Sequence, residues 1–191
     1  MAADPGRNPI VLVIAGPSGA GKGSITQRLL QRDERLHLSR SWTTRSRRPN
    51  EPPDWYTFVD RDTFEKKAAE GGFLEWAEVF DHLYGTPAPE LEGDHDVILE
   101  IDVQGAQQVR ERIPDAVVVF VRPPSRKEQE RRLVGRGDPP ELIERRLAKA
   151  DAEEEVGIAL ADLVVVNDEL ERATDIVRAF LRGLRAGLAR C

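Results

Sequence analysis

The chain has 191 residues, of which 40% are hydrophobic and 32% are charged, and its formal net charge is −6. These values suit one globular domain with a sizeable core, and the acidic excess argues against general nucleic-acid binding. We expect no membrane association and a cytoplasmic location, since no apolar stretch approaches the roughly 20 residues of a membrane span and residues 1–9 lack an apolar signal core. The single cysteine, Cys191, excludes a disulfide framework and a Cys/His metal site.

Residues 10–24 contain the most informative pattern in the chain. An apolar run over 10–15 meets a glycine-rich turn, which opens into a helical pattern over about 21–32. This order predicts a buried parallel strand that feeds a helix. The turn matches G-x-x-x-x-G-K at Gly16, Gly21 and Lys22, the pattern of a phosphate-binding loop.

The chemistry of such a loop follows from its residue types. Glycines let consecutive backbone N–H groups converge on phosphate oxygens, and the next helix presents its positive N-terminus to the same phosphates. Lys22 would reach the β- and γ-phosphates. The next position ordinarily carries a Ser or Thr whose hydroxyl contacts Mg²⁺, but here it is Gly23, followed by Ser24. This departure concerns the metal contact more than the phosphate contact.

The segment of about 38–90 is expected to form a small, mostly antiparallel unit inserted into a parallel framework. Asp62, with Glu65 three residues later, predicts a helix N-cap with a capping box, and the helix should end at Gly71 and Gly72. The other expected elements are strands over 38–48, 55–59, 73–80 and 82–87, with a turn over 49–53.

The parallel framework is expected to resume after the insertion. Buried strands are predicted over 97–102, 116–121 and 163–166, with helices over 103–112, 125–134, 141–155 and 169–188. Because strands alternate with helices, we expect a parallel sheet with ligands at the carboxyl ends of its strands.

Two basic clusters suggest that the chain holds small anions at chosen places. Residues 35–50 contain five arginines and no acid, and residues 122–149 contain nine Arg or Lys against five Asp or Glu. Arginine suits phosphate because its planar fork binds bidentately and stays charged. Any single arginine could equally be a solvated surface charge.

A few acids and tyrosines also have two readings. Glu75 lies in an apolar strand, where it either faces water or accepts hydrogen bonds from the N–H edge of a purine. Glu100 and Asp102 close a buried strand, either as acids that meet Mg²⁺ or its waters or as N-terminal acids of the next helix. Tyr56 and Tyr84 either pack in the interior or donate hydrogen bonds to a phosphate through their phenol groups.

Together these segments resemble the guanylate kinase family, whose members phosphorylate GMP with ATP. The resemblance covers about residues 10–184 and rests on separate motifs at 16–22, 41–48 (S-x-T-T-R-x-x-R), 73–77 (F-L-E-W-A), 84–86 (Y-G-T), 98–105, 132–137 and 166–168. It implies an α/β fold of the P-loop NTPase class, with a parallel sheet flanked by helices. It further implies a core (8–37, 91–125 and 153–191), a GMP-binding subdomain (38–90) and a helical lid (126–152).

The resemblance also implies roles by position. ATP would be bound by Gly16, Pro17, Ser18, Gly19, Ala20, Gly21, Lys22, Gly23, Ser24 and, near the adenine, Asn167. GMP would be bound by Ser41, Arg45, Arg48, Tyr56, Glu75, Tyr84, Thr86 and Asp102. The residues that act on the transferring group would be Lys22, Arg45, Arg132, Arg136 and Arg146. Mg²⁺ would accompany ATP, with Ser24, Glu100 or Asp102 as ligands through water; dGMP would be a second acceptor, and monomer and homodimer both remain open.

Two alternatives remain beside a GMP kinase: a catalytically inactive module that binds phosphopeptides, and a small kinase with another acceptor. The intact Lys22 argues against the first, and Ser41, Glu75 and Asp102 favour guanine over other bases. The loop over 49–54 and the loop after Gly137 are each about one residue shorter than in the family, which bears on Tyr56 and Arg146.

Overall fold

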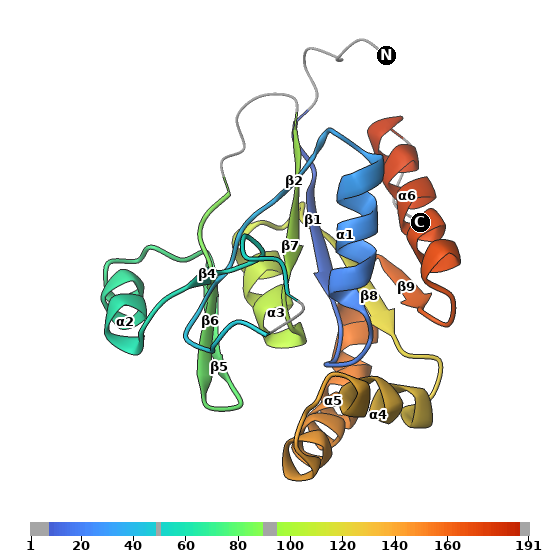
Figure 1. Cartoon of the computed structure of the whole chain (residues 1–191). Coiled ribbons are helices and arrows are strands. Elements are labelled where there is room, and N and C mark those ends of the chain that lie inside the picture. The colour runs from blue at the N-terminus through green and yellow to red at the C-terminus, as the bar shows by residue number, and fades with distance from the viewer. Residues whose placement is uncertain (1–7, 49–50, 90–94, 188–191) are drawn as a thin grey trace.

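The computed structural model of the chain describes residues 8–48, 51–89 and 95–187. Its main sheet has five strands in the order β2 (Leu36–Leu38), β7 (Asp96–Glu100), β1 (Val11–Ala15), β8 (Val117–Arg122) and β9 (Leu163–Val166). Every neighbouring pair in this sheet is parallel (Figure 1). The predicted parallel α/β framework, with the P-loop after its central strand, is therefore confirmed.

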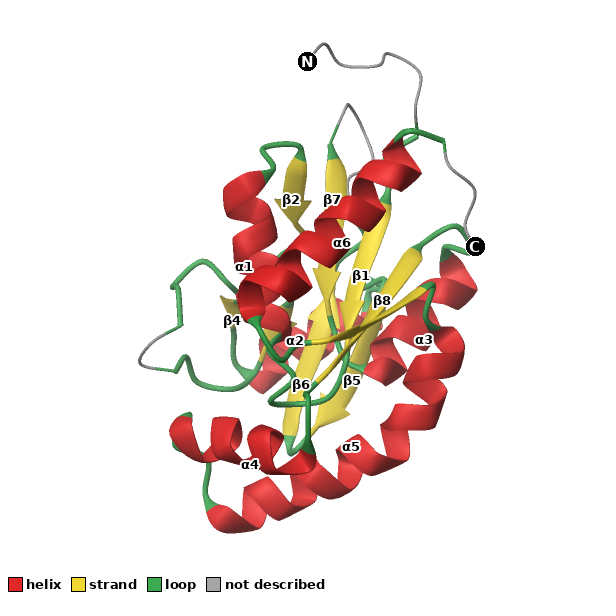
Figure 2. Cartoon of the chain, turned by 90° about the vertical axis from the view of Figure 1, so that its right-hand side faces the viewer, coloured by secondary structure: helices red, strands yellow, loops and turns green. Residues whose placement is uncertain are grey.

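Both faces of the main sheet are covered, which is why its strands read as unbroken apolar runs. Leu12 and Ile14 pack against α1 (Lys22–Arg32) and α6 (Leu170–Arg185). The opposite face of the sheet packs against α3 (Val103–Arg112) and the end of α5 (Pro140–Leu160) (Figure 2). The result is a three-layer core in which the carboxyl ends of all five parallel strands lie on the same side of the sheet.

A second sheet lies beside the core, in the order β4 (Thr57–Phe58), β3 (Trp42–Thr43), β6 (His82–Thr86) and β5 (Glu75–Val79). The pairs β3–β6 and β5–β6 are antiparallel and β3–β4 is parallel, so the predicted mostly antiparallel unit is confirmed. Its helix, α2 (Arg61–Ala69), buries Phe64 against Phe73 and Leu83. This unit therefore has a small apolar core of its own.

The third part is the helical pair formed by α4 (Arg126–Gly135) and the first half of α5. Ser125, at the start of the predicted helix over 125–134, caps α4 by accepting a hydrogen bond from the Glu128 N–H. Leu133 packs with residues of α5 in a separate apolar cluster. Because α5 is one helix from Pro140 to Leu160, it runs through the expected lid boundary at 152 into the core, and the division into lid and core stays a prediction.

Two local predictions are wrong. The strand expected over 38–48 is two short strands in different sheets, because β2 pairs with β7 in the core whereas β3 pairs with β6 in the second sheet. The N-cap of α2 is Asp60, whose carboxylate accepts from the Thr63 N–H at 2.7 Å, and Asp62 lies inside the first turn.

Some predictions fall on residues outside the described ranges: the start of the 49–53 turn, the beginning of the second core segment and Cys191. Among the helices that are described, none combines the length and the apolar character needed to cross a bilayer.

Candidate active site

A cleft of about 600 Å³ opens at the carboxyl ends of the core strands, where the P-loop, the second sheet and the α4–α5 pair meet. The predicted residues that line it are Pro17, Ser18, Gly19, Gly21, Lys22, Gly23, Ser24, Ser41, Arg45, Arg48, Tyr56, Glu75, Tyr84, Glu100, Asp102, Arg132, Arg136 and Arg146. The other predicted residues, Gly16, Ala20, Thr86 and Asn167, are each hydrogen-bonded to residues of the lining or to each other.

The P-loop depends on glycine at both ends. Gly16 has φ of 146°, and a Cβ there would lie 2.3 Å from the Val121 carbonyl oxygen. Gly21 has φ of 93°, and a Cβ there would lie 2.2 Å from the Asn167 amide nitrogen. The helix α1 begins directly after Gly21 without a side-chain cap, so its first N–H groups remain available to an anion.

Lys22 lies inside the curve of this loop. Its ammonium donates to the carbonyl oxygens of Gly16 at 2.7 Å and Pro17 at 3.3 Å. Burial lowers the pKa of Lys22, while the carboxylates of Glu100 and Asp102 oppose that effect. The side chain is thus a cation held by weak carbonyl partners, which phosphate oxygens can replace.

Asn167 and Arg132 fix the loop from behind. The Asn167 side chain is 4% exposed and donates to the Ala20 carbonyl at 2.8 Å. Arg132 donates to the Ala20 carbonyl at 3.2 Å and to the Asn167 carbonyl at 2.8 Å. Asn167 is not among the residues that line the cleft, and its side chain contacts the P-loop instead.

Two more arginines reach the P-loop side of the cleft, Arg136 from the C-cap of α4 and Arg146 from α5. Arg146 donates to the Ser18 hydroxyl at 2.8 Å, and its Nε lies 3.3 Å from the Asp138 carboxylate. Arg136 forms a two-point contact with the same carboxylate. Burial, followed by repulsion from Arg136, lowers the pKa of Arg146 to about 10, so the group stays charged at neutral pH. Asp138 therefore holds two like charges close together.

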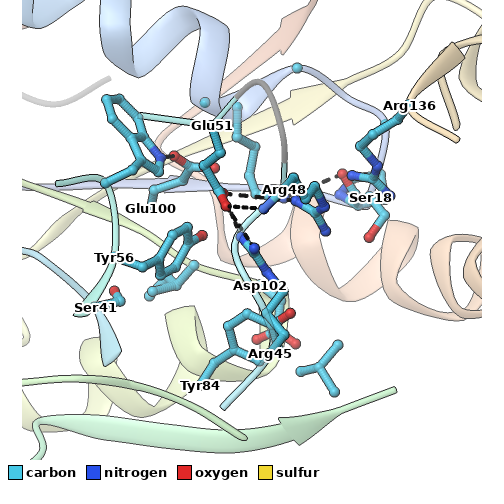
Figure 3. A pocket seen from close by; sticks show the side chains of 18 of the residues that line it. Ser18, Ser41, Arg45, Arg48, Glu51, Tyr56, Tyr84, Glu100, Asp102 and Arg136 are labelled. Carbon is cyan, nitrogen blue, oxygen red and sulfur yellow. Dashed lines mark hydrogen bonds and ion pairs between the residues drawn. The ribbon is translucent and has the colours of Figure 1, made fainter. Parts of the chain in front are cut away.

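On the opposite wall, Arg45 pairs with an acid that the sequence analysis did not single out. Its NH1 and NH2 groups donate to the two Glu51 carboxylate oxygens at 2.7 and 2.5 Å (Figure 3). The Arg48 backbone N–H donates to the same carboxylate at 3.3 Å. The Arg45 guanidinium also lies 4.9 Å from the centre of the Tyr56 ring. Tyr56 thus borders the arginine cluster although the loop before it is short.

Glu75 lies at the inner end of the cleft and is 4% exposed. Burial raises its pKa to about 7, against hydrogen bonds from Thr86 that lower it. Ser41 and Thr86 share a hydrogen bond of 2.9 Å beside it. A Cβ at Gly105 would lie 2.6 Å from a Glu75 oxygen, so α3 closes against the carboxylate only because residue 105 is glycine. This buried carboxylate can accept from a ligand with N–H donors.

Two acids lie near the start of α1. Glu100 accepts from the Trp55 indole N–H at 3.1 Å, and burial raises its pKa against the nearby Lys22. Asp102 caps α3 through the Gly105 N–H at 2.9 Å and also binds Lys149 at 2.9 Å. Its two oxygens are therefore engaged within the protein, whereas the second oxygen of Glu100 accepts no hydrogen bond from the described residues.

The donor set near the P-loop fits Mg²⁺ held with a nucleotide. No group of three or more His, Cys, Asp or Glu within the described ranges is arranged to hold a metal by itself. Mg²⁺ does not need one, because it keeps several waters and binds through one or two carboxylates and substrate phosphates. Glu100 and the exposed hydroxyl of Ser24 are the protein oxygens that fit this role.

The sequence analysis gave no role in this site to Glu51, Trp55, Phe80, Gly105 or Lys149, although Gly105 ends the motif at 98–105. A signal existed for Glu51, because it is the first acid after a basic run of sixteen residues without one. The other four act through contacts between elements far apart in the chain, which no local pattern reveals.

Comparisons with known proteins agree with this geometry. The family model described as guanylate kinase matches residues 7–184. A guanylate kinase of Chromobacterium violaceum is 49% identical over 88% of this chain and 85% of its own length. One of Thermus thermophilus is 48% identical over 92% and 81%, respectively. The crystal structure of guanylate kinase from Anaplasma phagocytophilum superposes with a TM-score of 0.75 at 31% identity, covering 92% of this chain and 86% of that one.

Proposed function

We infer that this cleft transfers the γ-phosphoryl group of ATP to GMP, because the chain belongs to the guanylate kinase family. The protein is an ATP:GMP phosphotransferase that yields ADP and GDP. The observation that carries this function is that one cleft holds a P-loop at one end and the buried carboxylate of Glu75 at the other. The roles of the individual residues below are our proposal.

The triphosphate of ATP is assigned to the P-loop side. The backbone N–H groups of residues 16–24, apart from Pro17, which has none, and the ammonium of Lys22 bind its phosphates. Arg132 keeps the loop in shape, while Arg136 and Arg146 neutralise charge on the transferring group. This assignment is supported by the hydrogen bond from Arg146 to Ser18 and by the free N-terminus of α1.

GMP is assigned to the other half of the cleft. Its phosphate binds Arg45, Arg48, Tyr56 and Tyr84, and its guanine is read by Glu75, with Ser41, Thr86 and Asp102 nearby. Guanine offers two neighbouring N–H donors, and a buried carboxylate accepts both while rejecting bases that lack them. The low exposure of Glu75 supports this reading.

Phosphoryl transfer requires alignment and charge neutralisation more than covalent help, so no single general base is assigned. Mg²⁺, when bound with ATP, neutralises charge that develops on the β- and γ-phosphates. Ser24 and Glu100 would hold it through water. Closure of the residues 126–152 and the residues 38–90 over both nucleotides excludes water from the transferring group.

Two further points belong to this proposal. We expect dGMP to be accepted, and the location in the cytoplasm stays a prediction, with which the single cysteine of the chain is consistent.

An acceptor panel tests the function. Purified protein with ATP and Mg²⁺ is assayed for ADP release with GMP, dGMP, AMP, UMP or no acceptor. We expect release with GMP and dGMP and little with the others. Equal release without an acceptor, or a preference for AMP or UMP, would overturn the assignment.

A further inference from the structure

The tip of the β5–β6 hairpin has an unusual residue in an unusual conformation. Strands 75–79 and 82–86 are joined by the two residues Phe80 and Asp81, whose φ values are 50° and 66°. A two-residue hairpin turn with both φ values positive favours Asn, Asp or Gly. A bulky aromatic residue is rare there and needs support from its surroundings.

That support comes from α5. The Arg146 guanidinium lies 4.8 Å from the centre of the Phe80 ring, that of Arg145 5.6 Å, and the Lys149 ammonium 5.7 Å. Arg145 also pairs with the Asp81 carboxylate at 3.2 Å. The tip of this hairpin, which belongs to the GMP-side unit (the second sheet with α2), therefore contacts the helix that carries Arg146.

The contact with Arg146 matters most, because this side chain connects two parts of the cleft. Its guanidinium lies between the Phe80 ring and the Ser18 hydroxyl of the P-loop, and it is 8% exposed. Arg136 lies on the same Asp138 carboxylate, so a like charge pushes against it. The face of an aromatic ring attracts a cation and offsets that repulsion without adding a competing anion to a phosphate site.

Lys149 extends the same contact toward the guanine end. It binds Asp102 at 2.9 Å, and Asp102 caps α3, the helix whose Gly105 packs against Glu75. The Phe80 ring thus contacts one cation that reaches the P-loop, Arg146, and another, Lys149, that reaches the start of α3, the helix that packs against Glu75.

We propose that Phe80 is a positioning residue for the transfer: it docks α5 on the GMP-side hairpin and holds Arg146 against the P-loop. This inference rests on the proposed function of the cleft and adds a residue to it. The hairpin tip reaches Arg146 only when the GMP-side unit lies close to the α4–α5 pair. Through Phe80, the position of Arg146 at the P-loop therefore depends on the position of the GMP-side unit.

The kinetic test uses Phe80→Leu, which keeps apolar volume but removes the ring, and Phe80→Tyr, which keeps the ring. We expect Phe80→Leu to lower kcat about tenfold with KM for GMP changed less than about twofold. Phe80→Tyr should keep at least half of the wild-type kcat. The matched control is Trp76→Leu on the same hairpin, a side chain that is 46% exposed and does not line the cleft as described; its kcat should equal that of the wild type.

A distance measurement separates docking from activity. In a Cys191→Ser background, spin labels at positions 66 and 144, both exposed, report the separation of α2 from α5 with GMP and a non-hydrolysable ATP analogue bound. We expect one narrow, short distance in the wild type and a longer or broader distribution in Phe80→Leu.

The outcomes are distinct. An unchanged distance distribution in Phe80→Leu, or a wild-type kcat, would overturn the role of Phe80 even if the protein phosphorylates GMP. A loss of kcat that thermal unfolding fully explains would also overturn it. Absence of GDP from the wild type would instead overturn the proposed function, while the labels would still decide whether Phe80 docks the helix.

Discussion

The guanidinium of Arg45 and the carboxylate of Glu51 face each other across two parallel hydrogen bonds of 2.7 and 2.5 Å. Both side chains are nearly buried, at 7% and 11% exposure. Burial works against the charged form of Glu51, but the Arg45 guanidinium holds its pKa below the ordinary 4.5. The pair therefore stabilises the fold above about pH 4.5, and that contribution is lost as the pH falls through the lowered pKa.

Glu51→Gln tests this relationship. Removing the carboxylate charge leaves Arg45 buried near other cations, so we expect a loss of about 2 kcal/mol in the free energy of unfolding. The GMP phosphate then supplies the missing negative charge, so saturating GMP should raise Tm more in the variant than in the wild type. Denaturant unfolding and thermal shift measure both effects.

The control for that experiment is Glu65→Gln, because Glu65 forms an exposed pair with Arg61 on α2. Exposed pairs contribute little, so this change should stay within about 0.5 kcal/mol of the wild type. An equal loss in both variants, or a smaller GMP shift in Glu51→Gln, would contradict the account.

The raised pKa of Glu75 predicts how GMP binding depends on pH. The pKa of about 7 follows from burial, so the carboxyl group takes up a proton as the pH falls below 7 and can no longer accept both guanine N–H groups. One pH unit below its pKa a group is only about one-tenth ionised, so KM for GMP should rise roughly tenfold between pH 8 and pH 6.

Glu75→Gln is the comparison for this pH profile. The amide does not titrate and offers one acceptor oxygen, so KM for GMP should be high at every pH, with only the shallow slope due to the ionisation of the GMP phosphate. KM for ATP should change little. Parallel pH profiles in the wild type and the variant would show that another group titrates.

Arg136 is expected to act on the transferring group. Arg136→Ala should lower kcat by about 10²–10⁴, somewhat below the range known for arginine fingers. Arg131→Ala is a suitable control, because this side chain on α4, the helix that Arg136 caps, is 73% exposed and pairs only with Glu128 among the contacts described. Pre-steady-state mixing with quench of the reaction measures the transfer step. A wild-type rate in Arg136→Ala would show that Arg136 has no role in the transfer step.

Gly23 permits a test of the metal contact. A Cβ there would lie 3.4 Å from both Glu100 carboxylate oxygens, an ordinary contact distance, so Gly23→Ser should fold. Its hydroxyl restores the usual motif, and we expect the Mg²⁺ concentration for half-maximal rate to fall by about threefold. Gly23→Ala, which adds the carbon without the hydroxyl, should leave this concentration unchanged. The same shift in both variants would exclude a role for the hydroxyl.

The parts of the fold that the sequence predicts well are those with strong local patterns. The helix over 103–112 and the strand over 163–166 are confirmed to the residue, because an acid cap or an unbroken apolar run defines each of them. The segment 38–48 is different, since its residues favour strands but cannot indicate which sheet they join. The choice is made by pairing with β7 and β6, which lie far along the chain.

The prediction of Asp62 as the N-cap of α2 was wrong for a related reason. Asp60 and Asp62 are equivalent as cap residues, but β4 pairing extends through the hydrogen bond from the Val59 N–H to the Thr43 carbonyl. That bond keeps the chain paired with β3 through residue 59, just after β4, so the helix begins at Arg61 and Asp60 becomes the cap.

In the cleft, the sequence motifs contain most of the lining residues, but they do not indicate which residues pair with them. Arg45 was identified but its partner Glu51 was not, and Glu75 was identified but its contact with Gly105, the last residue of the motif at 98–105, was not. Motifs record the residues that meet a ligand. The residues that orient them depend on packing between distant elements.

The central claim is that the cleft aligns ATP and GMP for one direct transfer. Its most direct test uses ATP made chiral with oxygen isotopes at the γ-phosphorus, followed by analysis of the GDP formed with Mg²⁺. In-line attack by GMP predicts inverted configuration at that phosphorus in GDP. Retention of configuration, which indicates two successive transfers through the protein, or the absence of labelled GDP would contradict the claim.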